Sequence, residues 1–425
     1  MTELPPPLLR NRWERWLAHA WRLAGTLPDR PLPAGWRLEL APGDRLAPGA
    51  RAVIAAALAA APEARMAYAD TVRIRGGRVA AVDLKPAFDP VFDAARPLAD
   101  FALCRAGPPP AEARHILHIP WPALITAREA ETRPFTPPAR LPSIAVVIPS
   151  RDAPRLIRTV LAGLDATDYP DLSVVVADNG STDPETLAEY ARRPALRVLM
   201  APGPFDFAAQ VNRAVAATRS EAVLLLNNDV EVIAPGWLRE MAACLGLPGV
   251  GIVGARLVYP DGRLQHAGTI LGLGGGLAGH WFAGAPPDSA GPADRLRHRG
   301  AFSAVTAACM LVSRRCWEVV GGMDAERFRV AYNDVDFCLR AAARGFATLW
   351  TPFATLIHHE KATRRLRGAA DRAAFAAEQA ALRARHGTHR VEDPAFSPWL
   401  TRSIRPRPRR LAAIPPGRHF RGPHG

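Results

Sequence analysis

The sequence contains almost no lysine and little cysteine. Lysine occurs only at Lys85 and Lys361, so nearly all of the 54 basic side chains are arginines. The 5 cysteines are scattered, odd in number and without a CxxC pair. This usage argues against a disulfide framework and against a zinc site, and it favours a reducing compartment.

Long apolar segments are absent as well. No uninterrupted apolar stretch reaches the roughly 20 residues that a transmembrane helix needs, so we expect none. Residues 1–7 lead directly into Arg- and Trp-rich sequence and show no signal-peptide pattern. We therefore expect a cytoplasmic protein, with peripheral contact to the inner face of an anionic cytoplasmic membrane as a further expectation.

The formal net charge of +14 leaves three classes of partner open. A strongly basic protein can be attracted to nucleic acid, to an anionic membrane or to phosphorylated substrates. An Arg- and Ala-rich coding bias explains the charge equally well. Because the chain has no recognised DNA- or RNA-binding module, we expect no nucleic-acid partner.

The length predicts two folded regions with tails, because 425 residues exceed what one core usually fills. A stiff, Pro-rich segment separates them. The expected segments are an amphipathic helix in 1–29, a small domain in 30–132, a linker in 133–142, an α/β domain in 143–366, a helix and tail strand in 367–400, and a basic disordered tail in 401–425.

The first predicted helix, residues 8–24, has two interpretations. One face carries Trp13, Trp16, Leu17, Ala20 and Trp21, and arginines are spread around it. Trp and Arg suit a helix that lies in a membrane interface. The favoured interpretation is a helix that docks on the body of the protein.

From residue 143 onward, short β-branched runs alternate with helical stretches. This alternation predicts βαβ units and a mostly parallel sheet with flanking helices, an α/β fold. Asp183 followed by Pro184 is typical of a helix start. Several apolar runs end in polar or acidic residues: 144–152, 173–183, 222–232 and 356–360. Because open α/β sheets bind ligands at the carboxyl ends of their strands, we expect a site there.

The segment from Ile144 to about Thr363 resembles the family 2 glycosyltransferases, most closely their rhamnosyltransferase-like bacterial branch. The matching phrases, in the family's order, include VVIPSRD, VVVADNGSTD, LLLNNDVEVIAPGWL, VGARLVYPDGRLQHAG, AYNDVDFCLR and HHEKATR. The resemblance implies the GT-A fold, which is Rossmann-like, and inverting transfer of a sugar from a nucleotide-diphosphate donor to a hydroxyl. It further implies a divalent cation (Mn or Mg), a lipid-linked or polysaccharide acceptor, and a role in bacterial cell-surface polysaccharide synthesis.

The resemblance assigns a set of residues to the donor nucleotide: Pro149, Ser150, Arg151, Asp178, Asn212, Asn227 and Asn228. Asp178 would accept hydrogen bonds from the base or ribose, because a carboxylate offers acceptors only. The alternative for Asp178 is a turn or helix cap. The alternative for Asn212 is a hydrogen bond within its helix.

The resemblance also places a metal site. The family's Asp-x-Asp motif has Asn227 at its first position here, so Asp229 is the only anionic member. Hard cations bind best to charged oxygen, and this departure predicts looser metal binding. His358 is the second implied contact with the metal or diphosphate; alternation along a strand favours it over His359.

Asp334 is the predicted catalytic base. The family usually has an acidic pair at this point, and this chain has Asn333 before Asp334. The start of a helix stabilises the carboxylate as the anion, the form that a base needs. The competing interpretation is that Asp334 only caps the helix and that Asp336 pairs with Arg340 at i, i+4.

Residues between the metal strand and the base usually shape the acceptor side of this fold. On that ground we expect acceptor contacts from His266, His280, Thr306, Trp350 and Asp336.

A second, weaker resemblance concerns residues 30–132. AYADTVRIRGGRVAAVDLKPAFDP resembles the metal-site strand of another such domain, and ARHILHIPWPALITAR resembles its last strand. Neither a first strand nor a catalytic acidic motif accompanies them. We interpret this region as a degenerate GT-A remnant kept as a scaffold or acceptor surface; an unrelated cap domain is the alternative.

Two other functions remain open at this stage. A catalytically silent scaffold or binding protein would explain Asn227 and Asn333. A nucleotidyltransferase has a similar fold, but it normally needs a Gly- and Lys-rich phosphate loop, and residues 149–154 contain no lysine. The sequence does not name the sugar, the acceptor or the oligomeric state.

Overall fold

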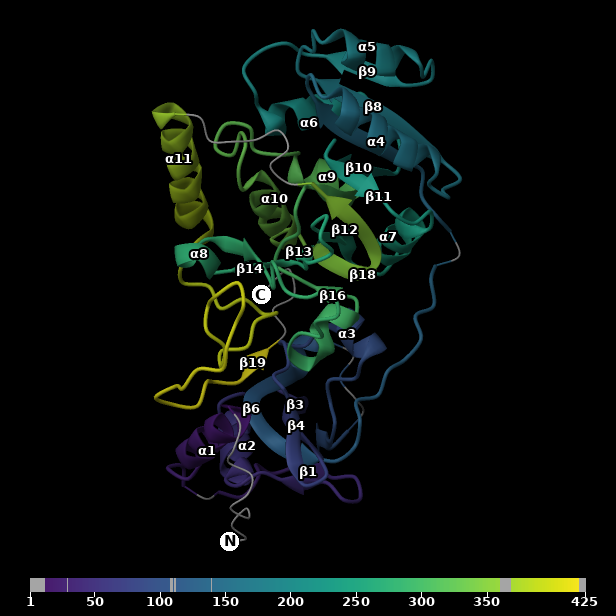
Figure 1. Cartoon of the computed structure of the whole chain (residues 1–425). Helices are drawn as coiled ribbons and strands as arrows, with labels where there is room; N and C mark the ends of the chain where they lie inside the picture. Colours follow the sequence, from purple (N-terminus) through teal and green to yellow (C-terminus); the bar gives the residue numbers. More distant parts are fainter. Residues whose placement is uncertain are drawn as a thin grey trace.

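The computed structural model describes residues 12–419 except 29, 108, 109, 111, 139 and 360–367. The chain builds two sheets with helices packed on them (Figure 1). This mixed α/β arrangement confirms the expected fold class. Residues 1–11 and 420–425 of the predicted terminal segments, and the predicted boundary at 366, lie outside the described residues.

The ten-stranded sheet, called the large sheet below, has the order β11-β18-β12-β17-β10-β7-β8-β9, with β13 on β12 and β16 on β18. Its strands are β7 (Ile144–Ser150), β8 (Leu172–Asp178), β9 (Arg197–Met200), β10 (Ala222–Leu226), β11 (Val230–Val232), β12 (Val250–Val258), β13 (Leu264–His266), β16 (Gly300–Ala301), β17 (Cys309–Ser313) and β18 (Ala347–His358). The half from β10 to β9 is parallel, as predicted, whereas the half around β12, β17 and β18 mixes both directions.

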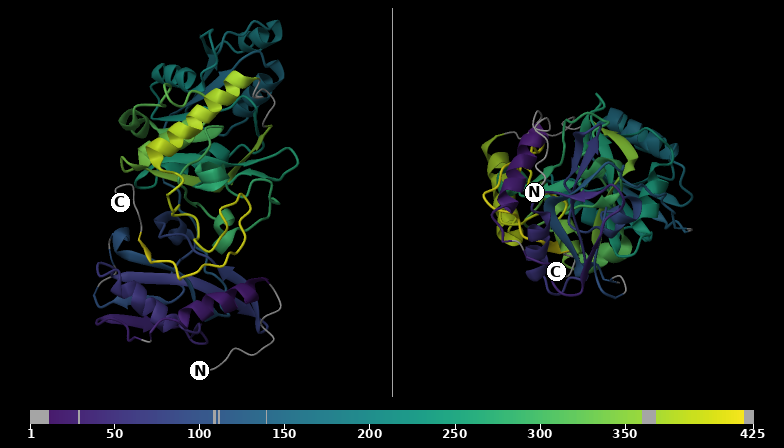
Figure 2. Two further views of the ribbon diagram at one scale, coloured as in Figure 1. Left: turned by 90° about the vertical axis from the view of Figure 1, so that its left-hand side faces the viewer. Right: turned by 90° about the horizontal axis from the view of Figure 1, so that it is seen from below.

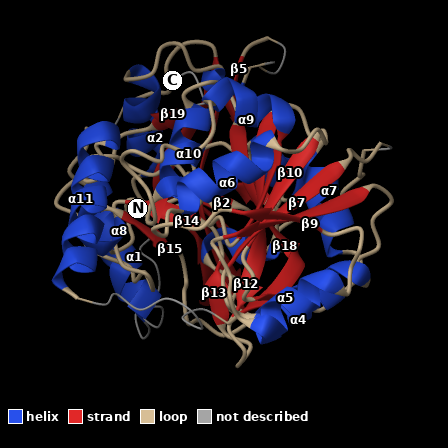
Figure 3. Ribbon diagram, turned by 90° about the horizontal axis from the view of Figure 1, so that it is seen from above, coloured by secondary structure: helices blue, strands red, loops and turns tan. Residues whose placement is uncertain are grey.

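Helices cover both faces of the large sheet (Figure 3). They are α4 (Pro154–Asp165), α5 (Pro184–Ala191), α6 (Phe207–Ala216), α7 (Trp237–Leu245), α9 (Arg314–Val320), α10 (Asn333–Ala342) and α11 (Ala369–His386). Side chains of β7 alternate between the faces: Ile144, Val146 and Ile148 join the core with α4 and α7, and Val147 joins the core with α6 and α10. The cap of α5 is as predicted, because Asp183 accepts a hydrogen bond from the backbone N–H of Thr186.

Residues 267–300 form an insertion between β13 and β16. It contains β14 (Thr269–Leu271) and β15 (Ala278–His280), which pair with each other, the short α8 (Leu273–Gly276), and a 3-10 segment (Pro292–Arg297). In α8, Gly274 and Gly275 have positive φ values of 59° and 78°, which suit the flexible glycine run seen in the sequence.

The seven-stranded sheet, called the small sheet, has the order β1-β5-β3-β6-β19, with β2 on β6 and β4 on β3. Its strands are β1 (Trp36–Glu39), β2 (Arg45–Leu46), β3 (Met66–Arg75), β4 (Arg78–Asp83), β5 (Ala102–Arg105), β6 (Ile116–Thr126) and β19 (Arg418–His419). The accompanying helices are α1 (Arg12–Ala24), α2 (Ala50–Ala59), α3 (Pro90–Ala95) and a 3-10 turn (Ala113–His115). Gly76 and Gly77, both with positive φ, make the predicted hairpin turn between β3 and β4.

The small sheet repeats part of the large one. Strand β3 is antiparallel to β4 and β5 and parallel to β6. Strand β12 is likewise antiparallel to β13 and β17 and parallel to β18. Thus β3 has the pairing pattern of β12, the long strand that follows the Asp229 segment, and β6 has the pairing pattern of β18.

The register supports this correspondence. In both parallel pairs the last strand bulges at a Pro-containing stretch: the pairing steps from Ile119 to Pro122 and Leu124 in β6, and from Thr351 to Thr355 in β18. Regular pairing then resumes at Leu124-Ile125-Thr126 and at Leu356-Ile357 before His358. Thr126 therefore occupies the place that His358 has in the large sheet.

Helix α1 docks on the protein, which agrees with the favoured interpretation. Trp16, Leu17 and Ala20 are buried, and the indole N–H of Trp16 donates to the backbone carbonyl of Arg409 at 2.8 Å. The rings of Trp16 and Trp399 meet edge to face with centroids 5.1 Å apart. No helix in the described ranges combines the length and hydropathy that a membrane span requires.

The segment 401–419 differs from the disordered tail that the sequence predicted. It runs between the small sheet and the rest of the chain (Figure 2). Arg418 and His419 form β19 against β6, and the side chain of Arg418 donates to the carbonyls of Asp393 and Phe396. The Pro- and Arg-rich composition predicted disorder. The contacts could not be predicted because the partner residues are far away in the sequence.

Candidate active site

The carboxyl ends of β7 and β8, in the parallel half of the large sheet, are joined by a hydrogen bond. Strand β7 ends at Ser150, whose carbonyl accepts from the backbone N–H of Asn179, just beyond β8, at 2.9 Å. The Ser150 hydroxyl accepts from the side-chain amide of Asn228 at 3.1 Å. Because parallel strands present their carboxyl ends at one edge, Ser150, Asn179 and Asn228 from three strands lie together there, as the sequence predicted.

Asp229 and His358 form the centre of this edge. Strand β11 is antiparallel to β18, so that Val230 lies opposite His358, and the Asp229 carbonyl accepts from the His359 N–H at 2.9 Å. His358 Nε2 lies 3.2 Å from Asp229 Oδ1, and both side chains are buried. Asp229 Oδ1 and the other ring nitrogen of His358, Nδ1, are buried and have no hydrogen-bond partner among the described residues.

The neighbouring acid and histidine point elsewhere. His359 Nε2 lies 2.9 Å from Glu231 Oε2, and both side chains are partly exposed. His358 and His359 are adjacent and point to different sides, as alternation predicts. Asp229, in the turn before β11, contacts the buried His358, whereas Glu231 within β11 contacts the partly exposed His359.

The side chains at this edge suit a divalent cation whose remaining ligands come from a substrate. A buried carboxylate oxygen without a partner and an imidazole beside it are suitable ligands. The described residues contain no group of three or more His, Cys, Asp or Glu side chains placed to hold a metal. Asp229 and His358 would thus be the protein ligands, and Mg²⁺ or Mn²⁺ sites at phosphates commonly use only one or two carboxylates.

Asp334 lies in the first turn of α10, as predicted. Its Oδ2 accepts from the backbone N–H of Ala307 at 3.1 Å, and its Oδ1 accepts from the N–H of Val335 at 2.8 Å. Tyr332, which precedes the helix, has a left-handed φ of 57°. The carboxylate is only partly buried, so one side remains accessible to a substrate.

His266 lies next to the segment that binds Asp334. Its Nε2 lies 3.3 Å from the backbone N–H of Thr306, next to the Ala307 that binds Asp334. Burial lowers the pKa of His266 well below its usual value, and His280 and His358 add to this effect. His266 is therefore neutral, and its ring meets that of His280 edge to face at 4.8 Å.

The predicted residues that gather at this edge come from seven segments of the chain. They are Ser150, Asn228, Asp229, His266, His280, Thr306, Asp334 and His358. Pro149 in β7 pairs with Ala177 of β8, Arg151 is exposed next to Asp152, and the Asn227 N–H donates to Ala308 O at 3.0 Å. These three lie beside the same strand ends.

Asp178 and Asn212 have their hydrogen-bonding groups occupied within the protein. The fully buried carboxylate of Asp178 accepts from the N–H and hydroxyl of Ser181, both at 2.6 Å, and from the hydroxyl of Tyr190 at 2.7 Å. The amide of Asn212 bonds both the N–H and the carbonyl of Met323. These contacts correspond to structural roles, turn-binding for Asp178 and loop-binding for Asn212.

Asp336 and Trp350 also have structural contacts. Asp336 is fully buried and binds Arg340 at 2.7 Å and His386 of α11 at 2.8 Å, the i, i+4 pairing that the competing interpretation predicted. Trp350 is fully buried with its ring 6.0 Å from that of Phe302, eight positions before His358 on β18. The structure does not bring these two side chains into contact with Asp334 or His358.

Two features of the site were not predicted. The backbone N–H of Ala307 orients Asp334, and the left-handed Tyr332 turns the chain into α10. A hydrogen bond from a backbone N–H cannot be predicted from residue type. A left-handed conformation is rare for tyrosine, so the sequence gives no reason to expect it. The side-chain amide nitrogen of Asn333 is buried with no partner among the described residues, beside the predicted base.

Comparison with known proteins decides the family. The model of the family described as "Glycosyltransferase like family 2" matches residues 142–383. The chain belongs to this family. The α/β large sheet agrees with the GT-A fold that the family resemblance implied.

Three curated proteins show the range of similarity to this chain. An uncharacterized protein y4gI of Sinorhizobium fredii is 43% identical over 63% of this chain and 30% of its own length. The O-antigen biosynthesis protein RfbC of Myxococcus xanthus is 37% identical over 65% of this chain and 22% of its own. The N-acetylglucosaminyl-diphospho-decaprenol L-rhamnosyltransferase of Mycobacterium tuberculosis is 29% identical over 52% of this chain and 76% of its own. The matches thus span less than a third of the first two relatives.

Similar solved structures include two sugar transferases. One is the mannosyltransferase PcManGT from Pyrobaculum calidifontis in complex with GDP-Man and Mn²⁺, with 19% identity, 62% of this chain and 69% of that chain covered, and a TM-score of 0.45. The other is GalNAc-T7 with UDP, GalNAc and Mn²⁺, with 14% identity, 51% and 43% coverage and a TM-score of 0.43. Both scores lie below 0.5, so neither likeness bears on the function.

Proposed function

We propose that this chain transfers a hexosyl or rhamnosyl group from a nucleotide-diphosphate donor to a hydroxyl of a lipid-linked or polysaccharide acceptor. Family membership supports the glycosyltransferase activity, and the names of two relatives, one for O-antigen biosynthesis and one for rhamnosyl transfer to a lipid diphosphate, support the class of acceptor. The observation that carries the proposal is the series of contacts from Asp334 through Ala307, Ala308 and Asn227 to Asp229 and His358: Ala307 N–H donates to Asp334, Asn227 N–H donates to Ala308 O, and Asp229 lies 3.2 Å from His358.

In the proposed mechanism, Asp334 takes the proton of the acceptor hydroxyl as this oxygen attacks the anomeric carbon. The bond between that carbon and the diphosphate oxygen breaks, and the configuration inverts in this single displacement. The N–H groups of Ala307 and Val335 each hold one carboxylate oxygen of Asp334, and the acceptor hydroxyl would approach a remaining lone pair on its partly exposed side.

At the leaving-group end, Asp229 and His358 would hold a divalent cation, Mn or Mg. Such a cation supplies Lewis-acid neutralisation of the charge that develops on the diphosphate. Ser150 and Asn228 fix the adjacent strand ends through their mutual hydrogen bond and so shape the donor pocket. Neutral His266 keeps the space between base and metal ligands free of an additional positive charge.

Release of nucleoside diphosphate from nucleotide sugars, measured with and without Mn²⁺, tests this function. A stereochemical assay of the product by NMR tests the inversion. The matched variants are Asp229→Asn and Glu231→Gln, because these acids lie two positions apart on the same segment and point to opposite sides. Activity should fall only in Asp229→Asn. Equal activity of both variants would contradict the assignment, and no release from any donor would favour a silent scaffold.

A further inference from the structure

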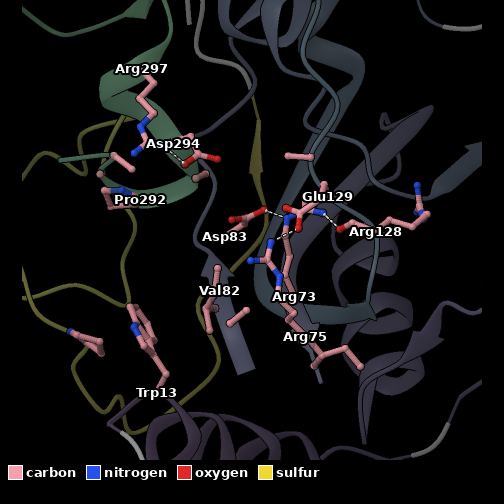
Figure 4. Close-up of a pocket in the computed structure, with 18 of the residues that line it drawn as sticks. Trp13, Arg73, Arg75, Val82, Asp83, Arg128, Glu129, Pro292, Asp294 and Arg297 are labelled. Carbon is pink, nitrogen blue, oxygen red and sulfur yellow. Dashed lines mark hydrogen bonds and ion pairs between the residues drawn. The ribbon is translucent and has the colours of Figure 1, made fainter. Parts of the chain in front are cut away.

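A cavity of about 630 Å³ lies between the small sheet, the insertion 267–300 and the C-terminal segment. Its volume is within the range of small-molecule sites in proteins. The small sheet contributes residues 73–75, 80–83 and 127–130, the insertion contributes Phe282 and residues 290–294, and α1 contributes Trp13. In Figure 4, Trp13, Pro292, Asp294 and Arg297 lie to one side, facing Asp83, Arg73 and Arg128.

The position of this cavity matches that of the active site. Residues 73–75 end β3, and residues 80–83 lie in β4, the counterpart of β13, which carries His266. Residues 127–130 follow Thr126, the counterpart of His358. The cavity is therefore at the edge of the small sheet that corresponds to the catalytic edge of the large sheet, although the metal-binding histidine is replaced there.

The charged residues of the cavity wall are compensated by ion pairs. Arg73 binds Asp83 at 2.7 Å, Arg75 binds Glu129, and Arg128 binds Asp44. On the insertion, Arg297 lies 3.9 Å from Asp294. A wall of this kind offers many hydrogen-bond donors and acceptors and no excess of one charge, so it suits a neutral polyhydroxylated ligand better than an anion.

Apolar surface completes the wall. Trp13 and Phe282 contribute aromatic rings, together with Ile74, Val82, Pro292 and Leu400. Aromatic rings present flat apolar area next to polar groups. This combination matches the alternation of C–H faces and hydroxyl edges on a sugar ring.

Backbone strain separates this cavity from an ordinary gap between domains. The described residues include five non-glycine residues with positive φ: Asp152, Phe282, Ala293, Asp294 and Tyr332. Asp152 and Tyr332 lie near the candidate active site, next to Arg151 and two residues before Asp334, and the other three line the cavity. Such strained conformations are costly and cluster at functional sites.

The cavity also adjoins the acceptor side of the active site. Phe282 comes two residues after His280, whose ring contacts His266. Behind the wall, the fully buried Arg96 bridges the two units by binding Asp83 at 2.8 Å and approaching Asp294 at 3.4 Å. Its Nη1 has no hydrogen-bond partner among the described residues.

We propose that this cavity is a non-catalytic subsite for the neutral sugar units of the growing acceptor glycan. The subsite would hold units remote from the reacting hydroxyl, so that the catalytic edge engages the chain end. This inference rests on the proposed function, because it presupposes a glycan acceptor.

Calorimetric titration with a neutral trisaccharide of rhamnose and N-acetylglucosamine tests the subsite directly. Ala80 is exposed and lines the cavity, so Ala80→Trp should fill it and weaken binding at least about tenfold. Ala56→Trp, at an exposed position of α2, is the matched control and should bind as the parent does. Unchanged affinity in Ala80→Trp, or saturable binding of inorganic phosphate in place of the trisaccharide, would overturn the proposal.

A second pair of variants tests the subsite independently, in case Ala80→Trp does not fold. Arg297 lines the cavity, is 61% exposed and has an i, i+3 acid partner, Asp294. Arg327, 57% exposed with its i, i+3 partner Asp324, is a close match away from the cavity. Arg297→Ala should weaken trisaccharide binding severalfold, whereas Arg327→Ala should leave it unchanged; equal effects would refute the subsite.

Transfer assays separate this inference from the proposed function. Asp334→Asn should abolish transfer and leave trisaccharide binding intact. Ala80→Trp should raise the KM for long acceptors and leave the KM for a single-sugar acceptor unchanged. Loss of transfer activity in the parent protein would therefore not affect the binding result, and an equal KM change for both acceptors would count against the subsite alone.

Discussion

The last strands of the two sheets, β6 and β18, have the same pattern but end differently. Both bulge at a Pro-containing stretch and then continue as Leu-Ile, followed by Thr126 in β6 and His358 in β18. In the large sheet, His358 and Asp229 leave buried polar atoms without partners. Next to the small sheet, Lys85 and Arg73 both bind Asp100. The small sheet also has a buried acid–histidine pair, Asp70 and His118 at 2.9 Å, but this pair forms a hydrogen bond, whereas no hydrogen bond joins Asp229 Oδ1 to a described residue.

The largest effect is expected when the catalytic edge is converted to the small-sheet version. His358→Thr should reduce transfer by at least about 100-fold. Even the loss of a residue that only hydrogen-bonds a metal ligand typically lowers metal affinity or activity 10- to 100-fold. The measurement is kcat/KM with Mn²⁺ present. The control is His359→Thr, which should retain activity because this ring faces Glu231. Similar losses in the two variants would mean that His358 has no special role. The proposed difference in function between the two sheets would then lose its support.

The next prediction concerns the ion pairs of the small sheet. Lys85 is fully buried, and its Nζ donates to Asp100 Oδ2 at 2.7 Å. Asp100→Ala should lower the free energy of unfolding by about 3 kcal/mol, because it leaves a buried ammonium group without its anion. Urea unfolding would measure this change. Glu129→Ala, which removes the partner of Arg75 at the surface, should cost less than about 1 kcal/mol.

The same carboxylate predicts a pH dependence of stability. Burial alone would raise the pKa of Asp100, but Lys85 and Arg73 outweigh burial and hold this pKa well below its usual 3.8. A depressed folded-state pKa contributes stability that is fully present above the unfolded value and is lost as the pH falls below about 3.8. Parent and Asp100→Asn should therefore differ in unfolding free energy at pH 6 and converge at strongly acidic pH. A difference that stays constant down to acid would show that charge is not its cause.

Local signals made much of the fold predictable. Pro154 and Pro184 begin helices, and Ala369–His386 followed by Gly387 is a helix with the predicted ends. These features depend on neighbours within a turn. The apolar runs before Asp229 and His358 predicted that both residues lie at strand ends, and Asp334 was expected at the start of a helix.

The remaining contacts depend on residues that are distant in the sequence. Asp178 looked like a nucleotide ligand, but Ser181 and Tyr190 saturate its oxygens, and no spacing rule reveals that. Asp336 binds His386, fifty positions away, across two helices. The tail 401–419 looked disordered because its composition is Pro- and Arg-rich, whereas its order depends on β6 and α1.

The smallest effect concerns the docking of α1 on that tail. Trp16→Phe keeps an aromatic ring against Trp399 but removes the indole N–H that donates to the Arg409 carbonyl. The expected loss is about 1 kcal/mol of unfolding free energy, the typical contribution of one hydrogen bond. A urea titration followed by circular dichroism can resolve this difference. Because the bond joins α1 to the tail, protease sensitivity of residues 401–419 should rise in parallel. Unchanged stability and unchanged cleavage in this variant would mean that α1 and the tail do not stabilise each other. Membrane binding by α1 would then be the interpretation to test next.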